Sequence, residues 1–138
     1  MQTVTPYLYY ADVDAALTFL AEAFGFEETV RYTGPEGYVS HAEMRIGDGS
    51  VMMGDPGDDY RNPAQLGGST QGTHVYVADV DALFERARAA GAAIVDEPTD
   101  KPYGDRSFTA RDPEGHVWFI ATHVRDVEPV DWGAATGA

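Results

Sequence analysis

The chain has 138 residues, no cysteine and a formal net charge of −14, from 23 acidic and 9 basic side chains. This length suits one domain, or two small repeated modules that share a core. The charge argues against partners such as nucleic acid or an anionic membrane surface. The absence of cysteine excludes disulfides, thiolate metal sites and cysteine nucleophiles. With no apolar run of membrane-spanning length and no signal peptide at Met1, we expect a cytoplasmic protein.

The first predicted unit begins with a short strand at residues 8–10, where aromatic side chains favour extended backbone. An amphipathic helix follows, because apolar residues recur at helical spacing from Val13 to Leu20. Asp12 is suited to cap this helix and Gly25 to end it. Three extended segments complete the unit, at residues 28–32, 38–46 and 51–53.

The same order of elements recurs in the second half of the chain. The residues Ala11–Ala15 reappear as Ala78–Ala82, 67 positions later, again after a strand and at the start of an apolar helical stripe. Asp79 is the corresponding cap and Gly91 the corresponding stop. Extended segments follow at residues 93–97, 107–111 and 117–120. The pattern predicts an α+β fold made of two strand-helix-three-strand units, typical of a duplicated module.

The expected organisation is one domain over residues 1–138. Its first module covers residues 3–55, and residues 56–72 form a polar linker rich in Gly, Pro, Asp and Ser. The second module covers residues 73–124, and residues 125–138 form a tail. In that tail, Trp132 is expected to dock on the body or on a partner chain.

Two motifs carry a resemblance to a known family. Residues 72–81 (GTHVYVADVD) resemble the opening of a module of the vicinal oxygen chelate superfamily, and residues 111–118 (RDPEGHVW) resemble its closing hairpin. That superfamily includes glyoxalase I, extradiol dioxygenases, epimerases and bleomycin-resistance proteins. The resemblance implies two βαβββ modules that form a cupped, mixed eight-stranded sheet with helices outside. It also implies a homodimer, with each cup closed within one chain or between two.

The resemblance further implies where a metal ion would be held. Family members that use a metal take one ligand from the first and one from the last strand of each module, which corresponds here to Tyr7, Met53, His74 and Phe119. Only His74 is a good ligand, Met53 is too soft for oxygen-seeking metals, and Phe119 cannot coordinate. We therefore expect no cofactor, with a divalent metal at His74 as the alternative. His74 is equally explained as a hydrogen-bonded histidine at the end of a strand.

Strand alternation predicts which side chains face the cup. His41 and Glu43 share one face of a strand, so they are candidates for a general base and the group that orients it, or for a solvated polar pair. The predicted ligand-binding residues are Tyr7, Tyr9, Met53, His74, Tyr76, Thr109 and Phe119, with Val51, Ser107 and Val117 also lining the cup. Residues 103–106 favour a surface turn with an ion pair between Asp105 and Arg106, with the rim of the cavity mouth as the alternative. His116 indicates a residue in a surface loop, and His123 either a residue at the cavity rim or an exposed one.

Two functions from different classes follow. The first is binding of a small, cationic or aromatic molecule, as in bleomycin-resistance proteins, without the usual metal, since an aromatic cup and a charge of −14 suit such a guest. The alternative is a metal-dependent lyase, isomerase, epimerase or dioxygenase-type enzyme that uses His74 with non-standard ligands. Metal analysis of protein purified without chelators distinguishes the two.

Overall fold

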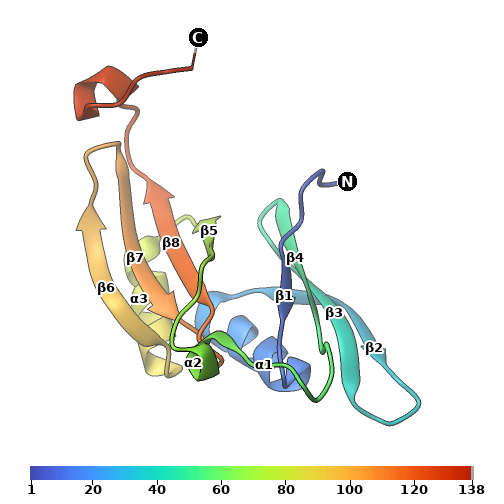
Figure 1. Cartoon of the computed structure of the whole chain (residues 1–138). Helices are drawn as coiled ribbons and strands as arrows, with labels where there is room; N and C mark the ends of the chain where they lie inside the picture. The colour runs from blue at the N-terminus through green and yellow to red at the C-terminus, as the bar shows by residue number, and fades with distance from the viewer. Residues whose placement is uncertain (138) are drawn as a thin grey trace.

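The computed structural model describes residues 1–137, and its first unit forms one four-stranded sheet with a helix on one face (Figure 1). The sheet order is β1-β4-β3-β2. Only β1 and β4 run parallel, so the sheet is mixed. The elements are β1 (Tyr7–Tyr9), α1 (Val13–Phe24), β2 (Glu27–Thr33), β3 (Val39–Ile46) and β4 (Gly49–Gly54).

The second unit repeats this topology, with sheet order β5-β8-β7-β6 and a parallel β5–β8 pair. Its elements are β5 (Gly72–Tyr76), α3 (Val80–Ala89), β6 (Ala93–Asp100), β7 (Asp105–Arg111) and β8 (Val117–His123). The predicted α+β fold of two βαβββ units is therefore confirmed.

The helix ends follow the local sequence. The carboxylate of Asp12 accepts a hydrogen bond from the backbone N–H of Ala15, and Asp79 caps α3 in the same way through Ala82, so both predicted caps are present. Gly25 ends α1 in the left-handed conformation. The buried stripe of each helix packs against one face of its own sheet, and α1 also packs against α3.

The carboxylate of Asp112 joins the two units. It lies in the turn between β7 and β8, is 4% exposed, and accepts hydrogen bonds from the Tyr10 hydroxyl (2.6 Å) and the Trp118 indole N–H (3.0 Å). Its other oxygen accepts the backbone N–H groups of Glu114 and His116. Because Tyr10 belongs to the first unit and Trp118 to the second, one buried carboxylate ties the two together.

The linker and the tail carry structure that the sequence pattern did not predict. Within the linker, α2 (Pro63–Leu66) is a single turn closed by a reciprocal capping box between Asn62 and Gln65. In the tail, the short helix η1 (Pro129–Trp132) places the Trp132 ring edge-on to Tyr103, with ring centroids 5.6 Å apart. Trp132 thus docks on the body of its own chain. In residues 1–137 no helix is long and apolar enough to cross a membrane.

The two sheets are not hydrogen-bonded to one another, so the eight predicted strands form two four-stranded arms (Figure 1). The arms diverge from the region where α1 and α2 lie, α3 lies behind the second arm, and the N-terminus and η1 lie at the opposite, open end (Figure 1). Each sheet has its helix on one face only. The other face of each sheet is left open to the solvent, and these two open faces hold the predicted site residues other than Met53, which is buried on the helix side.

The joint at Asp112 gives a prediction about stability. Asp112→Asn should lower the free energy of unfolding by at least about 3 kcal/mol, because in either orientation its NH2 group would face two donors: Tyr10 and Trp118, or the backbone N–H groups of Glu114 and His116. Tyr10→Phe removes one donor and should cost about 1–2 kcal/mol. Urea unfolding measures both changes. Asp58→Asn, in the exposed linker, is the matched control and should stay within about 0.5 kcal/mol; equal losses in all three variants would contradict the assignment.

Candidate functional site

The open face of the first sheet is aromatic along β1. Tyr7 and Tyr9 are 48% and 52% exposed, whereas Leu8 between them is buried against the helix side. The strand pairing places Met52, Glu43 and His41 on the same open face, along with Val30 and Tyr32 at the outer strand. We call these seven residues the first open face.

Met53 does not line the cup, so its prediction as a ligand-binding residue is wrong. It is fully buried and pairs with Ala42 and Leu8 on the helix side, as the buried Val51 does with Met44, so neither lines the cup. Met52, opposite Tyr7, takes that place. The reason is the hairpin: β3 and β4 are joined by the two residues between Ile46 and Gly49, while β7 and β8 are joined by the longer loop between Arg111 and Val117. Met52, not Met53, therefore corresponds to Phe119.

A hydrogen-bonded chain links three side chains of this face. The Tyr7 hydroxyl lies 2.9 Å from Nδ1 of His41, and Nε2 of His41 lies 3.0 Å from a carboxylate oxygen of Glu43. Since the ionised carboxylate of Glu43 only accepts hydrogen bonds, it favours the proton on Nε2, which leaves Nδ1 to accept the Tyr7 hydroxyl. The two predicted catalytic candidates thus meet a third residue.

Tyr7 reaches His41 by crossing β4, and a glycine makes room for it. A methyl group on Gly54, the strand partner of His41, would overlap the Tyr7 hydroxyl. Burial, and then the neighbouring Tyr9 and Glu43, raise the pKa of Tyr7 above its ordinary value. The phenol therefore stays protonated near neutral pH.

The second open face combines His74, Tyr76, Phe119 and Thr109, all predicted site residues. The His74 ring lies 4.8 Å from the Tyr76 ring and 6.4 Å from the Phe119 ring, centroid to centroid. Phe119 pairs with His74 and Thr109, while Trp118 and Ile120 on either side are buried. A methyl group on Gly72 would overlap the Phe119 ring, so a glycine again lets an aromatic side chain lie across the neighbouring strand.

A cluster that the sequence pattern missed lies at the upper end of this face. The nearly buried carboxylate of Asp105 accepts the Tyr76 hydroxyl at 2.8 Å and lies 2.9 Å from Nδ1 of His123. Asp126 lies 2.7 Å from Nε2 of the same ring. The expected local ion pair of Asp105 does not form, because Arg106 instead pairs with Asp81 and Asp100. Strand alternation could have signalled the cluster, since Asp105 is four residues before Thr109.

The electrostatics of this cluster follow from its contacts. Burial acts to raise the pKa of Asp105, but the hydrogen bonds from His123 and Tyr76 outweigh it, and the pKa of the carboxyl falls below its ordinary value. The hydrogen bonds to Asp105 and Asp126 raise the pKa of His123. The hydrogen bond to Asp105, followed by burial, raises the pKa of Tyr76.

A small cleft of about 190 Å³ lies where β1 faces the linker and the start of β8. Tyr7, Tyr9 and Val117 contribute to its wall, with Tyr60 and His116. The Tyr60 hydroxyl donates to the backbone carbonyl of Tyr9, and Nε2 of His116 lies 2.7 Å from the same oxygen. His116 is thus a contact between the two units. Burial, and then Glu114 and Asp112, raise the pKa of Tyr60 to about 12.

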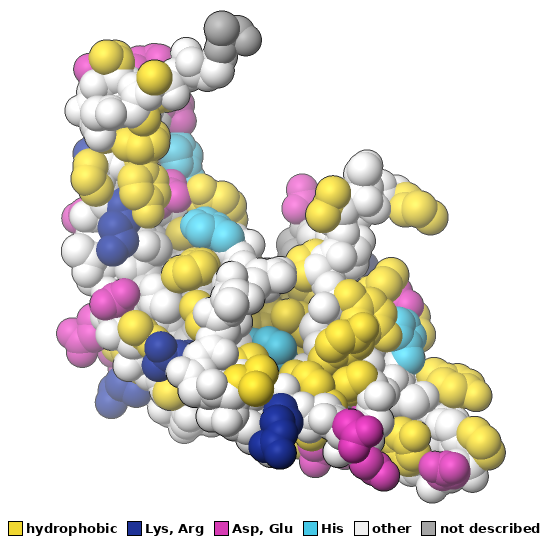
Figure 2. Space-filling view, viewed as in Figure 1, with side chains coloured by type: hydrophobic (Ala, Val, Ile, Leu, Met, Phe, Trp, Pro, Cys, Tyr) yellow, Lys and Arg dark blue, Asp and Glu magenta, His cyan; other side chains and the backbone are white. Residues whose placement is uncertain are grey.

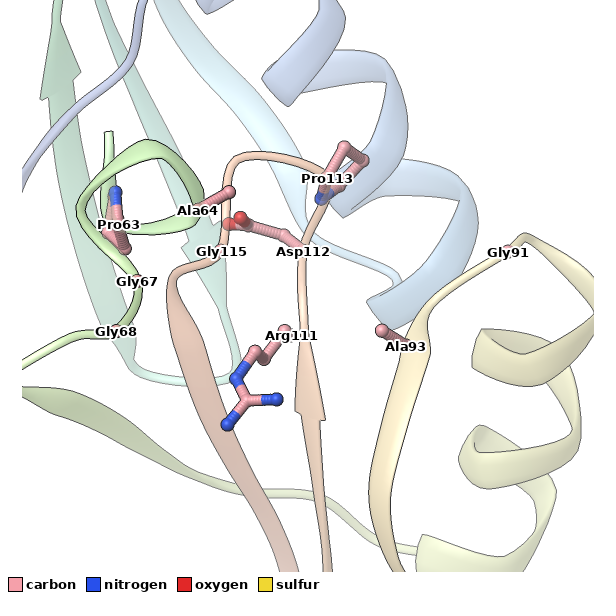
Figure 3. Close-up of a pocket in the computed structure, with 10 residues that line it drawn as sticks. All are labelled: Pro63, Ala64, Gly67, Gly68, Gly91, Ala93, Arg111, Asp112, Pro113 and Gly115. Atoms are coloured by element: carbon pink, nitrogen blue, oxygen red, sulfur yellow. The ribbon is translucent and has the colours of Figure 1, made fainter. Parts of the chain in front are cut away.

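Hydrophobic and histidine side chains lie on both arms, on either side of a deep hollow (Figure 2). A separate depression of about 450 Å³ lies between α2 and the turn that follows β7 (Figure 3). Its lining is mostly glycine, alanine and proline, and the carboxylate of Asp112 in its wall is already committed to Tyr10 and Trp118. Arg111 is the remaining charged side chain there, so this depression offers little for recognising a ligand.

The residues present do not fit a metal centre of the kind the resemblance implies. At the four corresponding positions stand Tyr7, Met52, His74 and Phe119, and the hydroxyl of Tyr7 is engaged with His41. Among residues 1–137, no three or more His, Asp or Glu side chains are arranged to hold a metal ion. His74 is the one good ligand of the four.

The family model of the Glyoxalase/Bleomycin resistance protein/Dioxygenase superfamily matches residues 2–120. The chain belongs to this superfamily. An uncharacterized protein of Mycobacterium bovis is 38% identical over 129 residues, which cover 90% of this chain and 85% of that protein. A second uncharacterized protein, from Mycobacterium tuberculosis, has the same identity, and the match covers 76% of it.

Solved structures agree with this membership. TioX from Micromonospora sp. ML1 is 36% identical and superposes with a TM-score of 0.73, covering 90% of this chain and 100% of TioX. A lactoylglutathione lyase from Agrobacterium tumefaciens is 24% identical, with a TM-score of 0.61, and covers 88% of this chain and 94% of that one. At that identity the second likeness supports the fold alone. The superfamily is established, and the chemistry of this member depends on its own side chains.

The cluster at His123 predicts how stability depends on pH. Because the folded protein raises the pKa of His123, the imidazolium contributes stability that is fully present below the ordinary value of 6.5 and is lost as the pH rises through the raised pKa. Asp105 has a lowered pKa, so its contribution is present above its ordinary value of 3.8 and is lost as the pH falls through the lowered pKa. His123→Gln should flatten the loss of stability above pH 6.5, as measured by urea unfolding at a series of pH values.

His116→Gln is the matched control, because His116 contacts a backbone carbonyl and not a carboxylate. It should leave the loss of stability above pH 6.5 unchanged. A loss of the same size in His123→Gln would contradict the assignment.

Proposed function

We propose that this protein binds a small aromatic molecule, preferably one carrying a positive charge, on its open faces. The observation that carries the proposal is the exposure of large aromatic side chains on both faces. Tyr9 is 52% exposed, Tyr76 60% and Phe119 38%, although each sheet already buries its other side against a helix. A sheet that is apolar on both faces needs a second cover, and a ligand supplies one.

The charge of the molecule supports the preference for a cation. The net charge of −14 attracts cations from a distance, and the carboxylate of Glu43 lies among the aromatic rings of the first open face. Aromatic faces attract ammonium groups with about 0.5–2 kcal/mol, most strongly when water is excluded. The same charge disfavours nucleic acid and anionic membranes as partners.

The metal-dependent alternative has less support from the side chains. A catalytic zinc site uses three protein ligands with an open fourth position, and His74 is the single suitable residue at the corresponding places. Its ring packs beside Tyr76 and Phe119, which suits a binding surface equally well.

We also propose that the protein is a homodimer in which a second copy covers the outer parts of the arms. Exposed apolar side chains extend beyond the ligand-binding residues on each arm: Val30, Tyr32, Tyr38, Val95, Tyr103 and Trp132. Exposed large apolar side chains are enriched at interfaces between proteins, and an isologous pair brings the same surface of each copy together.

The binding proposal predicts a preference between two probes of similar shape. Phenyltrimethylammonium should bind and benzoate should not, as measured by isothermal titration calorimetry at low salt, because only the cation gains from the aromatic rings and the acidic protein. Tyr9→Ala and Tyr76→Ala should each weaken binding about 5- to 30-fold, which corresponds to about 1–2 kcal/mol. Tyr103→Phe, in which the ring against Trp132 is kept, is the control.

Tight binding of benzoate with no binding of the cation would overturn the charge preference. Unchanged affinity in both alanine variants would overturn the location of the site.

The dimer proposal predicts a mass of twice the 14.9 kDa chain by size-exclusion chromatography with light scattering. Tyr32→Arg and Val95→Arg should shift the protein to the monomer, because each would place a charge in an apolar contact. Leu66→Arg on α2 is exposed but belongs to neither arm, and it should leave the dimer intact. A monomeric wild-type protein would contradict the proposal.

A further inference from the structure

We propose that Tyr7, His41 and Glu43 form a metal-free proton relay, through which the Tyr7 phenol exchanges protons with a carbon acid bound on the first open face. This inference rests on the proposed binding function and adds an activity to it. The substrate class is an aromatic carbonyl compound with an acidic C–H bond beside the carbonyl group, most favourably one that carries a cationic group nearby.

The polarity of the hydrogen bonds supports the relay. In the tautomer that the acceptor Glu43 favours, Nε2 of His41 donates to the carboxylate, and Nδ1 accepts the proton of Tyr7; the two pairs lie 3.0 Å and 2.9 Å apart. The lone pairs on the Tyr7 oxygen therefore remain available to a ligand, because its proton points at the imidazole. A carboxylate that orients a histidine, which in turn holds the proton of a hydroxyl, is the general arrangement for activating a weakly acidic hydroxyl group.

The position of the relay supports its use on a ligand. The Tyr7 side chain is 48% exposed on the open face, and the Tyr9 ring lies edge-on to it at 5.7 Å, so an aromatic guest that contacts Tyr9 lies beside the Tyr7 oxygen. His41 and Glu43 are partly buried under this surface. Gly54 gives the phenol the space to reach across β4. Together, these features place the phenol oxygen of Tyr7 at the surface and the imidazole of His41, its proton acceptor, partly beneath it.

The proposed step is redox-neutral and balanced in protons. The Tyr7 oxygen takes a proton from the C–H bond while its own proton moves to Nδ1 of His41, and the electron pair of the broken C–H bond forms the enolate of the ligand. The resulting imidazolium is stabilised by the carboxylate of Glu43. Return of a proton to the same carbon exchanges it, and return to the opposite face or to another atom of the enolate isomerises the ligand.

The second unit lacks the relay, which confines the activity to the first open face. By strand pairing, Tyr7, His41 and Glu43 correspond to His74, Ser107 and Thr109. The aromatic character of the face is kept there, but the carboxylate–imidazole–phenol chain is not. The second open face can therefore serve as a comparison for the first, because it has the aromatic side chains but not the relay.

The experiment uses phenacyltrimethylammonium, a cationic aromatic ketone with an acidic CH₂ group between the carbonyl and the ammonium. Exchange of these protons for deuterium in D₂O is followed by proton NMR, and binding by calorimetry. Wild-type protein should accelerate exchange over buffer. Tyr7→Phe should abolish the acceleration while binding stays within about threefold, because general acid–base catalysis is worth about 100- to 10,000-fold and the ring is kept. Tyr103→Phe, the same change outside the site, should exchange at the wild-type rate.

The partners of Tyr7 are tested by separate variants. His41→Asn should lower the exchange rate about 100-fold, and Glu43→Gln about 10-fold, since glutamine can still orient His41 but cannot stabilise the imidazolium. Glu43→Asp should restore part of the rate, which a merely structural role would not require. Gly54→Ala keeps all three side chains but displaces the phenol, and should lower exchange as strongly as His41→Asn. Gly72→Ala, the matched change on the second face, should not.

Nitrogen-15 NMR of the imidazole rings tests the relay without a ligand. His41 should carry its proton on Nε2, and Tyr7→Phe should shift the Nδ1 resonance of His41. A proton on Nδ1, exchange that persists in Tyr7→Phe, or a bound probe that does not exchange would each overturn the relay. A bound but inert probe leaves the binding function standing, whereas a probe that does not bind overturns the proposed function and the substrate class together.

Discussion

The arrangement of the two open faces depends on one buried carboxylate. Asp112 accepts four hydrogen bonds, and one donor, Tyr10, comes from the other unit. A carboxylate this buried is tolerated only when its lone pairs are satisfied, so the units meet in the one relative position that supplies the donors. Nearby, Glu114 accepts the backbone N–H groups of Ala11 and Asp12 and fixes the start of α1 against the same turn. These polar contacts act together with the packing of α1 against α3 and of Phe24 and Phe26 against Trp118 in fixing how the two units meet.

That fixed angle explains why the site is built on strands. Each open face takes its residues from strands whose opposite sides are packed against α1 or α3. The side chains on the open faces are therefore attached to a rigid backbone. Gly54 and Gly72 then allow Tyr7 and Phe119 to lie across a neighbouring strand rather than project from it. The aromatic rings are thereby spread out as broad surfaces, which suits a flat guest more than a spherical ion.

Local features could be predicted from the sequence, whereas features that depend on register or on distant contacts could not. The caps at Asp12 and Asp79 and the buried Trp118 and Ile120 follow from neighbours in sequence. Met53 was assigned to the wrong face because the two hairpins differ in length, and a shift of one residue reverses a strand. Alternation placed His41 and Glu43 together, but the contact with Tyr7 spans a strand between them. The contact between Asp112 and Tyr10, which are 102 residues apart in the chain, required the tertiary structure.

Tyr7 on the first open face and Tyr76 on the second differ in the group that lies within hydrogen-bond distance of their hydroxyls, and this difference decides which of them can take part in proton transfer. In the tautomer that Glu43 favours, Tyr7 donates to the imidazole of His41, and the carboxylate of Glu43 lies on the other side of that ring. Tyr76 donates to the carboxylate of Asp105, whose pKa is held below its ordinary value by His123 and by Tyr76 itself despite its burial. A carboxylate with a lowered pKa does not accept a proton at neutral pH, so Tyr76 can orient a ligand but has no base behind it. Tyr76 corresponds by strand pairing to Tyr9 and not to Tyr7, whose counterpart is His74. The two units therefore place these two phenols at different positions of their first strands, and the proposed proton transfer is limited to the unit in which an imidazole stands behind the phenol.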